Sequence, residues 1–136
     1  MTSQLNVDAI VDKAGSGGTN VKVGNASTYV SDGGNVTQNT VQGLAKSWCH
    51  FDGGSFGIED SFNVASADDN GSGSYDVNYS NNFASANNCP TGLANNFTLF
   101  INSDPTTSAF IMGTRNASNA NVDSTTVTTK THGDLA

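Results

Sequence analysis

The chain has 136 residues, of which only 12% are charged, and its five basic and twelve acidic residues give a formal net charge of −7. This length holds one domain with a single hydrophobic core and leaves room for an arm. The basic residues are dispersed through an acidic chain, which argues against binding to nucleic acid or to anionic membranes.

No apolar run approaches the roughly 20 residues of a membrane-spanning helix, so we expect no membrane insertion. The first residues have neither the basic nor the apolar region of a secretory signal. If the protein acts outside cells, we therefore expect its release by lysis. The surplus of Asn, Ser, Thr and Gly disfavours helices and favours a β-rich protein.

Residues 1–45 contain no Phe, Trp or Cys, and their apolar residues are widely spaced. Four apolar side chains open this segment: Leu5, Val7, Ile10 and Val11. They are too few for a core of their own, so we predict an extended arm over 1–45 that becomes ordered against identical copies of the chain. In the alternative, the arm wraps its own domain, which hides the same side chains.

Aromatic residues become frequent from Trp48 onward, so the core is expected in residues 46–136. Within this part, GGSFG at 53–57 matches the G-x-S-x-G pattern of a serine nucleophile. The chain order also offers possible partners downstream: Asp104, Asp123 and His132. A nucleophile elbow needs a helix after the serine, whereas the alternation of Phe56 and Ile58 predicts a strand. We therefore predict a hairpin, with Ser55 as a turn residue.

The clearest strand signal lies further on, where Tyr75, Val77 and Tyr79 alternate with polar residues. A short apolar run at 62–65 precedes it, and the segment between them, 68–73, is rich in residues that tolerate a positive φ angle. Together they predict a β-hairpin with a longer loop.

The same loop is similar to a calcium-binding loop. Oxygen-bearing residues and a glycine fall at suitable spacings: Asp68, Asn70, Ser72, Gly73 and Asp76. The twelfth position is Tyr79, where an EF-hand has a bidentate glutamate, and no helices are predicted on either side. The hairpin is the favoured interpretation, and a weak surface calcium site is the alternative.

Three more strand candidates, 97–101, 109–113 and 125–131, are bounded by Asn, Ser, Asp, Pro or Gly clusters. Short strands at turn-punctuated spacing predict an all-β fold, with an antiparallel β-sandwich or jelly-roll-like body. We divide the chain into an extended N-terminal assembly arm, 1–45, and a β-sandwich-like domain, 46–136.

The two cysteines, Cys49 and Cys89, allow one disulfide but favour two reduced thiols. Both cysteines, together with His50 and His132, are residue types that can bind zinc. The paired ligand spacings typical of zinc sites are missing, however. The two histidines are isolated, and His50 is expected on the polar face of a strand. The sequence predicts no catalytic, cofactor-binding or metal-binding residues.

Four short patterns occur together in residues 43–87. They are KSWxxF at 46–51, DSFNV at 60–64, DNGxGxYxVxY at 69–79 and NNFASAN at 81–87. In this order they resemble a domain of tail-fibre-like structural proteins of bacteriophages, marine ones in particular. The opening SQLNVDAIVDKAG also resembles the start of such chains.

The resemblance implies a non-enzymatic virion protein that forms a homotrimer and is displayed as a fibre or appendage. We expect assembly in the host cytoplasm and contacts with other virion proteins, on the tail or the capsid. Capsid decoration is one alternative. Another is a carbohydrate-binding or host-adhesion module for a surface glycan, which an exposed aromatic cluster beside loops 66–74 or 102–108 would favour.

Overall fold

The computed structural model describes residues 28–30, 37–40 and 43–135. By its contacts the chain divides into two compact units, Met1–Val41 and Gln42–Ala136.

In the first unit, strands β1 (Thr28–Val30) and β2 (Thr37–Asn39) pair antiparallel, with Thr28 opposite Asn39. The four predicted assembly residues lie outside the described residues: Leu5, Val7, Ile10 and Val11.

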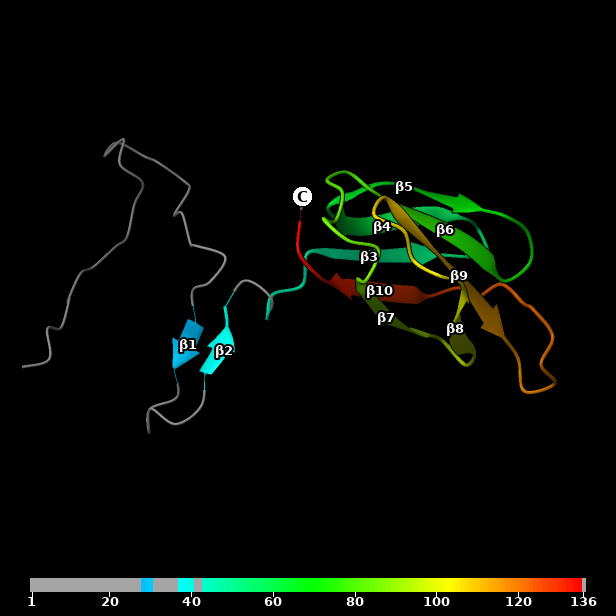
Figure 1. The fold of residues 1–136 in the computed structure, drawn as a ribbon. Helices are drawn as coiled ribbons and strands as arrows, with labels where there is room; N and C mark the ends of the chain where they lie inside the picture. Colours follow the sequence, from blue (N-terminus) through cyan, green and yellow to red (C-terminus); the bar gives the residue numbers. More distant parts are fainter. Residues whose placement is uncertain (1–27, 31–36, 41–42, 136) are drawn as a thin grey trace, which may run out of the picture. The chain divides into compact units, whose positions relative to one another are not determined.

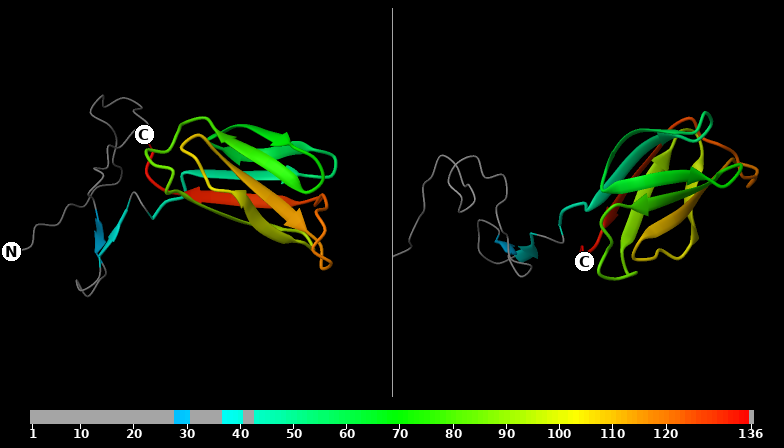
Figure 2. Two further views of the ribbon diagram at one scale, coloured as in Figure 1. Left: turned by 45° about the vertical axis from the view of Figure 1, so that its right-hand side comes forward. Right: turned by 90° about the horizontal axis from the view of Figure 1, so that it is seen from above.

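The second unit is a β-sandwich, which confirms the predicted all-β fold (Figure 1). Its strands are β3 (Ser47–Asp52), β4 (Gly57–Phe62), β5 (Val64–Asp69), β6 (Ser74–Tyr79), β7 (Cys89–Ala94), β8 (Thr98–Ser103), β9 (Ala109–Arg115) and β10 (Val127–His132). The first sheet has the order β4–β3–β10–β7 and the second β5–β6–β9–β8, with antiparallel neighbours in both. Figure 2 shows the two sheets as separate layers. The described part of the chain contains no helix long and apolar enough to cross a membrane.

The core lies between the two sheets and follows the alternation of the strands. On β6, Tyr75, Val77 and Tyr79 are buried, as the sequence pattern predicts. Phe51 of β3 meets Tyr75 across the sandwich, with ring centroids 5.1 Å apart in an edge-on arrangement. Phe110 of β9 packs on Tyr79 from the neighbouring strand. Aromatic contacts therefore join the inner faces of both sheets.

The predicted apolar run at 62–65 is a corner rather than one strand. Phe62 ends β4 in the first sheet, and Val64 begins β5 in the second. Asn63 between them has φ 55°, a left-handed conformation that asparagine tolerates better than most residues. Its side-chain amide donates to the carbonyl oxygens of Lys46 and Asn81, at 3.0 and 3.1 Å. The corner is thus held by hydrogen bonds from one asparagine.

Strand β7 is not predicted by the sequence pattern, because it contains Pro90 and Gly92, which are both uncommon in strands. The position of β7 in its sheet explains both residues. β7 is an edge strand that pairs only with β10, and an edge tolerates the missing N–H of proline. A side chain on Gly92 would overlap the carbonyl oxygen of Thr128 on β10.

Candidate binding face

The GGSFG stretch forms the turn between β3 and β4, which confirms the predicted hairpin. The Asp52 carboxylate accepts hydrogen bonds from the backbone N–H groups of Gly54 and Ser55, at 2.7 and 3.1 Å. Ser55 lies beyond the last residue of β3, whereas His132 ends β10 beside the first residues of β3. The length of that strand, roughly 20 Å, therefore separates Ser55 from His132.

Asp123 connects the turns at the Ser55 end of the sandwich. Its Oδ1 accepts hydrogen bonds from the Gly73 backbone N–H at 2.6 Å and from the Tyr75 hydroxyl at 3.2 Å. The Tyr75 hydroxyl in turn accepts from the Ser124 backbone N–H. Burial raises the pKa of Tyr75, which keeps its hydroxyl protonated as a donor. These bonds give Asp123 a structural role.

The residues of the alternative calcium-loop interpretation lie in the β5–β6 hairpin, where side chains bond one another. The Asn70 amide donates to Asp76 at 2.6 Å, and the Asn78 amide donates to Asp68 at 2.8 Å. Among the residues that the structure describes, no three His, Cys, Asp or Glu side chains are grouped so as to hold a metal ion. The segment is therefore a β-hairpin, which is the interpretation that the sequence favours.

Both cysteines are free thiols, as favoured by the sequence. Cys49 is 1% exposed inside the sandwich, while Cys89 at the start of β7 is exposed. Burial raises the pKa of Cys49 to about 11, so its thiol stays protonated and unreactive at neutral pH. His50 follows Cys49 on the strand and therefore points to the opposite face. This alternation separates two of the four residues of the zinc hypothesis.

The outer face of the first sheet carries a row of side chains that crosses all four strands. In register, Phe62, Trp48, Lys130 and Thr91 lie opposite one another on β4, β3, β10 and β7. Phe62 is 54% exposed and Trp48 is 38% exposed, so both aromatic side chains face solvent. Adjacent strands are about 4.8 Å apart, so the row is roughly 14 Å long.

A second row runs beside the first, with Asp60, His50, Thr128 and Leu93 in register. Leu93 is 76% exposed. A shallow hollow of about 540 Å³ lies on this face, and its lining includes residues of both rows. We call the following set the Trp48 face: Trp48, Phe62, Thr91, Leu93, Thr128 and Lys130.

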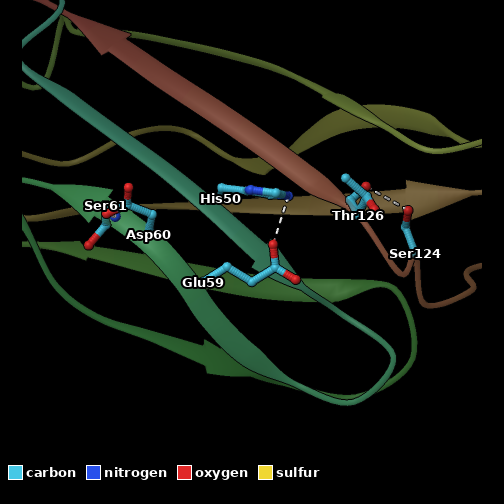
Figure 3. Close-up of polar contacts among 6 residues, drawn as sticks. All are labelled: His50, Glu59, Asp60, Ser61, Ser124 and Thr126. Carbon is cyan, nitrogen blue, oxygen red and sulfur yellow. Dashed lines mark hydrogen bonds and ion pairs between the residues drawn. The ribbon is translucent and has the colours of Figure 1, made fainter.

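Charged groups flank the Trp48 face on the β4 side. His50 Nε2 and Glu59 Oε2 are 3.2 Å apart (Figure 3), and both side chains are partly exposed, at 39% and 55%. Glu59 is the extra residue of a bulge that shifts the β3–β4 register after His50. Within the described part of the chain, Lys130 makes no ion pair. The face therefore presents one unpaired ammonium group beside its aromatic rings.

A smaller cavity of about 280 Å³ opens between edge strands β7 and β8. Pro90 and Ile101 stand at the two strands, and Phe110 and Met112 from β9 line the cavity as well. Phe110 and Met112 are buried core residues. This cavity is a gap in the core along one edge of the sandwich.

The sequence contains a signal for the Trp48 face. This signal is easily missed, because aromatic residues are generally assigned to the core. Trp48 and His50 are two residues apart and thus share a face of β3. The sequence predicts His50 on the polar face of its strand, so the same alternation places Trp48 on the outer face as well. The exposed aromatic pair lies on a sheet and not beside loops 66–74 or 102–108.

In comparisons with protein-family models, curated protein sequences and solved structures, nothing matched this chain.

Proposed function

We propose that the chain is a non-enzymatic structural protein of a bacteriophage virion, displayed as a fibre or appendage on the tail or the capsid. The resemblance of residues 43–87 supports this proposal. Its patterns fall on β3, the β4–β5 corner, the β5–β6 hairpin and the segment that follows β6. The resembling residues thus form the framework of the sandwich rather than a peripheral loop.

One observation carries the assembly part of the proposal. The buried apolar core of the second unit is formed by residues between Cys49 and Val127, within the unit Gln42–Ala136. The four apolar side chains that open the sequence are too few for a core of their own. We infer that they are buried among identical copies, which form a homotrimer, because ordering a chain segment requires apolar contacts in return.

In this proposal the arm joins the copies and attaches them to other virion proteins, while the sandwich is displayed. Assembly takes place in the host cytoplasm, and lysis releases the particle. A capsid-decoration protein is the same proposal at another location on the particle. Immunogold labelling with an antibody against the sandwich, on purified particles of the phage that encodes the chain, locates it on tail or capsid. Particles without label would contradict the proposal.

The oligomeric state tests the role of the arm. We expect the full chain to sediment as a trimer. A variant with four substitutions, Leu5→Asn, Val7→Asn, Ile10→Asn and Val11→Asn, is expected to sediment as a monomer with an unchanged circular dichroism spectrum. A matched control carries four substitutions at polar arm positions: Ser3→Asn, Ser16→Asn, Thr19→Asn and Ser27→Asn. A monomeric full chain, or a fourfold variant that remains trimeric, would contradict the assembly proposal.

A second candidate function, binding of a surface glycan, is favoured by the exposure of Trp48 and Phe62 on one sheet face. The two functions are compatible, because a displayed virion protein can also contact the host surface.

A further inference from the structure

We propose that the Trp48 face binds a saccharide that carries a carboxylate group. This inference deepens the glycan-binding candidate by naming its site and ligand class, and it does not depend on trimer formation. It rests on three features of the face: exposed aromatic rings, hydroxyl groups on neighbouring strands and an ammonium group without an ion pair.

The aromatic pair supplies a surface for a sugar ring. Trp48 and Phe62 are directly opposite on adjacent strands, and both side chains are exposed. The face of an aromatic ring is electrostatically negative, and the C–H groups of a pyranose ring are weakly positive. A sugar ring can therefore pack on either side chain while its hydroxyl groups remain in water. An indole ring does so with more area than any other side chain.

The threonines supply directional contacts beside the rings. Thr128 and Thr91 both lie on the outer face, on β10 and β7, and both are exposed. The Thr91 hydroxyl donates to the Lys130 carbonyl oxygen at 3.4 Å and can accept a hydrogen bond from a ligand. The Thr128 hydroxyl can both donate and accept, which matches the hydroxyl groups of a saccharide. The nearby hollow of about 540 Å³ is within the usual range of ligand sites, about 300 to 1,000 Å³.

Lys130 indicates that the ligand carries a negative charge. It lies directly opposite Trp48 and makes no ion pair in the part of the chain that the structure describes. The chain has a net charge of −7, so a bound anion must be attracted by a local positive group. Lys130 provides one beside the ring, where a carboxylate on a stacked sugar can form a charge-assisted hydrogen bond.

A second copy of the chain fits this face less well. A twofold contact uses the same patch on both partners, so it would bring two Lys130 side chains into one interface. Within one copy the carboxylates on this side of the sheet, Asp60 and Glu59, lie on β4, two strands from Lys130 on β10. A contact centred on Lys130 would therefore bury the two ammonium groups away from these carboxylates, which is costly. The mixture of rings, hydroxyls and one cation suits a small polar ligand with an apolar side.

The test uses Trp48 as its own reporter, because it is the only tryptophan in the chain. The full chain is titrated with N-acetylneuraminic acid and with glucuronate and galacturonate oligosaccharides, and tryptophan emission is recorded. Neutral oligosaccharides of the same length and sodium acetate at the same ionic strength are run in parallel. We expect a saturable change with an acidic saccharide, and affinity at least about tenfold weaker for its neutral counterpart.

Substitutions test whether the change in tryptophan emission arises from binding at the Trp48 face. Lys130→Met is expected to weaken binding of the acidic saccharide about tenfold and to leave the neutral one unchanged. Arg115→Met removes a positive charge from the other sheet and is the matched control, expected to bind like the unmodified chain. Phe62→Ala is expected to weaken both saccharides. Melting temperatures confirm that each variant is folded.

Four outcomes would overturn the inference. They are no saturable change with any acidic saccharide, equal affinity for neutral and acidic saccharides, equal saturation by acetate, and self-association of the chain that Trp48→Ala abolishes. The fourfold arm variant separates this inference from the virion proposal, because we expect it to bind the saccharide with unchanged affinity. Sugar binding without trimers, or trimers without sugar binding, thus identifies which proposal fails.

Discussion

On the outer face of the second sheet, polar side chains bond one another, whereas the outer face of the first sheet leaves two aromatic rings and the Lys130 ammonium group available. In the second sheet, Asn78 donates to Asp68 at 2.8 Å, and the Arg115 guanidinium lies 4.1 Å from the centre of the Phe100 ring. In the first sheet, Trp48 is exposed and Lys130 has no ion pair among the described residues.

The difference between the two faces separates stability from recognition. Groups that satisfy each other stabilise a fold and have little left for a ligand. Groups that remain unsatisfied at the surface add little stability but can exchange water for a ligand. We therefore expect substitutions around the second sheet to change the free energy of unfolding, and substitutions on the Trp48 face to change binding.

The largest expected loss of stability is at Gly73, in the turn of the β5–β6 hairpin, whose strands belong to the second sheet. Gly73 has φ 61°, and a Cβ there would lie 2.5 Å from the carbonyl oxygen of Thr114. Gly73→Ala therefore adds backbone strain to a steric overlap, and we expect the free energy of unfolding to fall by about 3 kcal/mol. Urea unfolding measures it.

Gly71 is the matched control for Gly73. It also has a positive φ, 106°, but a Cβ there would contact nothing within 4 Å. Gly71→Ala should cost only the backbone strain, about 1 to 2 kcal/mol. Equal losses in the two variants would show that the overlap at Gly73 contributes nothing.

The interior that both sheets share should weaken in alkali. Burial raises the pKa of Cys49 from its ordinary value of 9.0 to about 11, and that of Tyr79 from 10.0 to about 12. Between these values the unfolded chain has lost protons that the folded chain retains, so stability falls as pH rises. At pH 11, the Cys49 thiol alone should cost roughly 2 kcal/mol.

Unfolding in urea at a series of pH values checks this expectation. Cys49→Ala should remove the part of the loss that begins near pH 9 and leave the later part that the buried hydroxyl groups of Tyr75 and Tyr79 cause. A variant with the same alkaline profile as the unmodified chain would contradict the assignment to Cys49.

A smaller effect is expected from the aromatic pair of the Trp48 face. Trp48 and Phe62 are cross-strand neighbours, and such pairs contribute about 0.2 to 1 kcal/mol. A double-mutant cycle with Trp48→Ala and Phe62→Ala should give a coupling free energy in that range. A coupling well above 1 kcal/mol would mean that the pair holds the sheet together, and the contrast between the faces would disappear.

The smallest effect is expected at the ion pair beside that face. Both side chains, His50 and Glu59, are partly open to solvent, and ion pairs at the surface contribute about 0 to 1 kcal/mol. Glu59→Gln should change the free energy of unfolding by less than about 0.5 kcal/mol. The same variant should bind the acidic saccharide at least as well, because it removes a negative charge from the same side of the first sheet. Weaker binding would contradict the assigned ligand charge.

Much of the sandwich could be predicted because its hairpins depend on local signals. The alternation of Tyr75 to Tyr79 and the turn residues around Ser55 act over a few residues, and the structure confirms both hairpins. The corner at Asn63 and the edge strand with Pro90 could not be predicted in the same way. Their conformations are favourable only because of where they lie among the sheets.

The candidate site was harder to predict than the fold. Aromatic residues usually indicate a core, and five aromatic residues of the body are indeed buried: Phe51, Tyr75, Tyr79, Phe83 and Phe110. Trp48 is an exception that only strand parity with His50 reveals. Which residues face each other across strands depends on the register of β4, β10 and β7 with β3, and no local pattern contains that information.

The most direct test of the contrast between the faces is a map of amide chemical shifts in the isotope-labelled full chain, recorded with and without an acidic saccharide that changes Trp48 emission. We predict shifts concentrated at residues 48, 62, 91, 93, 128 and 130, with the outer residues of β6 and β9 unchanged. Shifts centred on β6 and β9, or spread evenly over both sheets, would contradict the account.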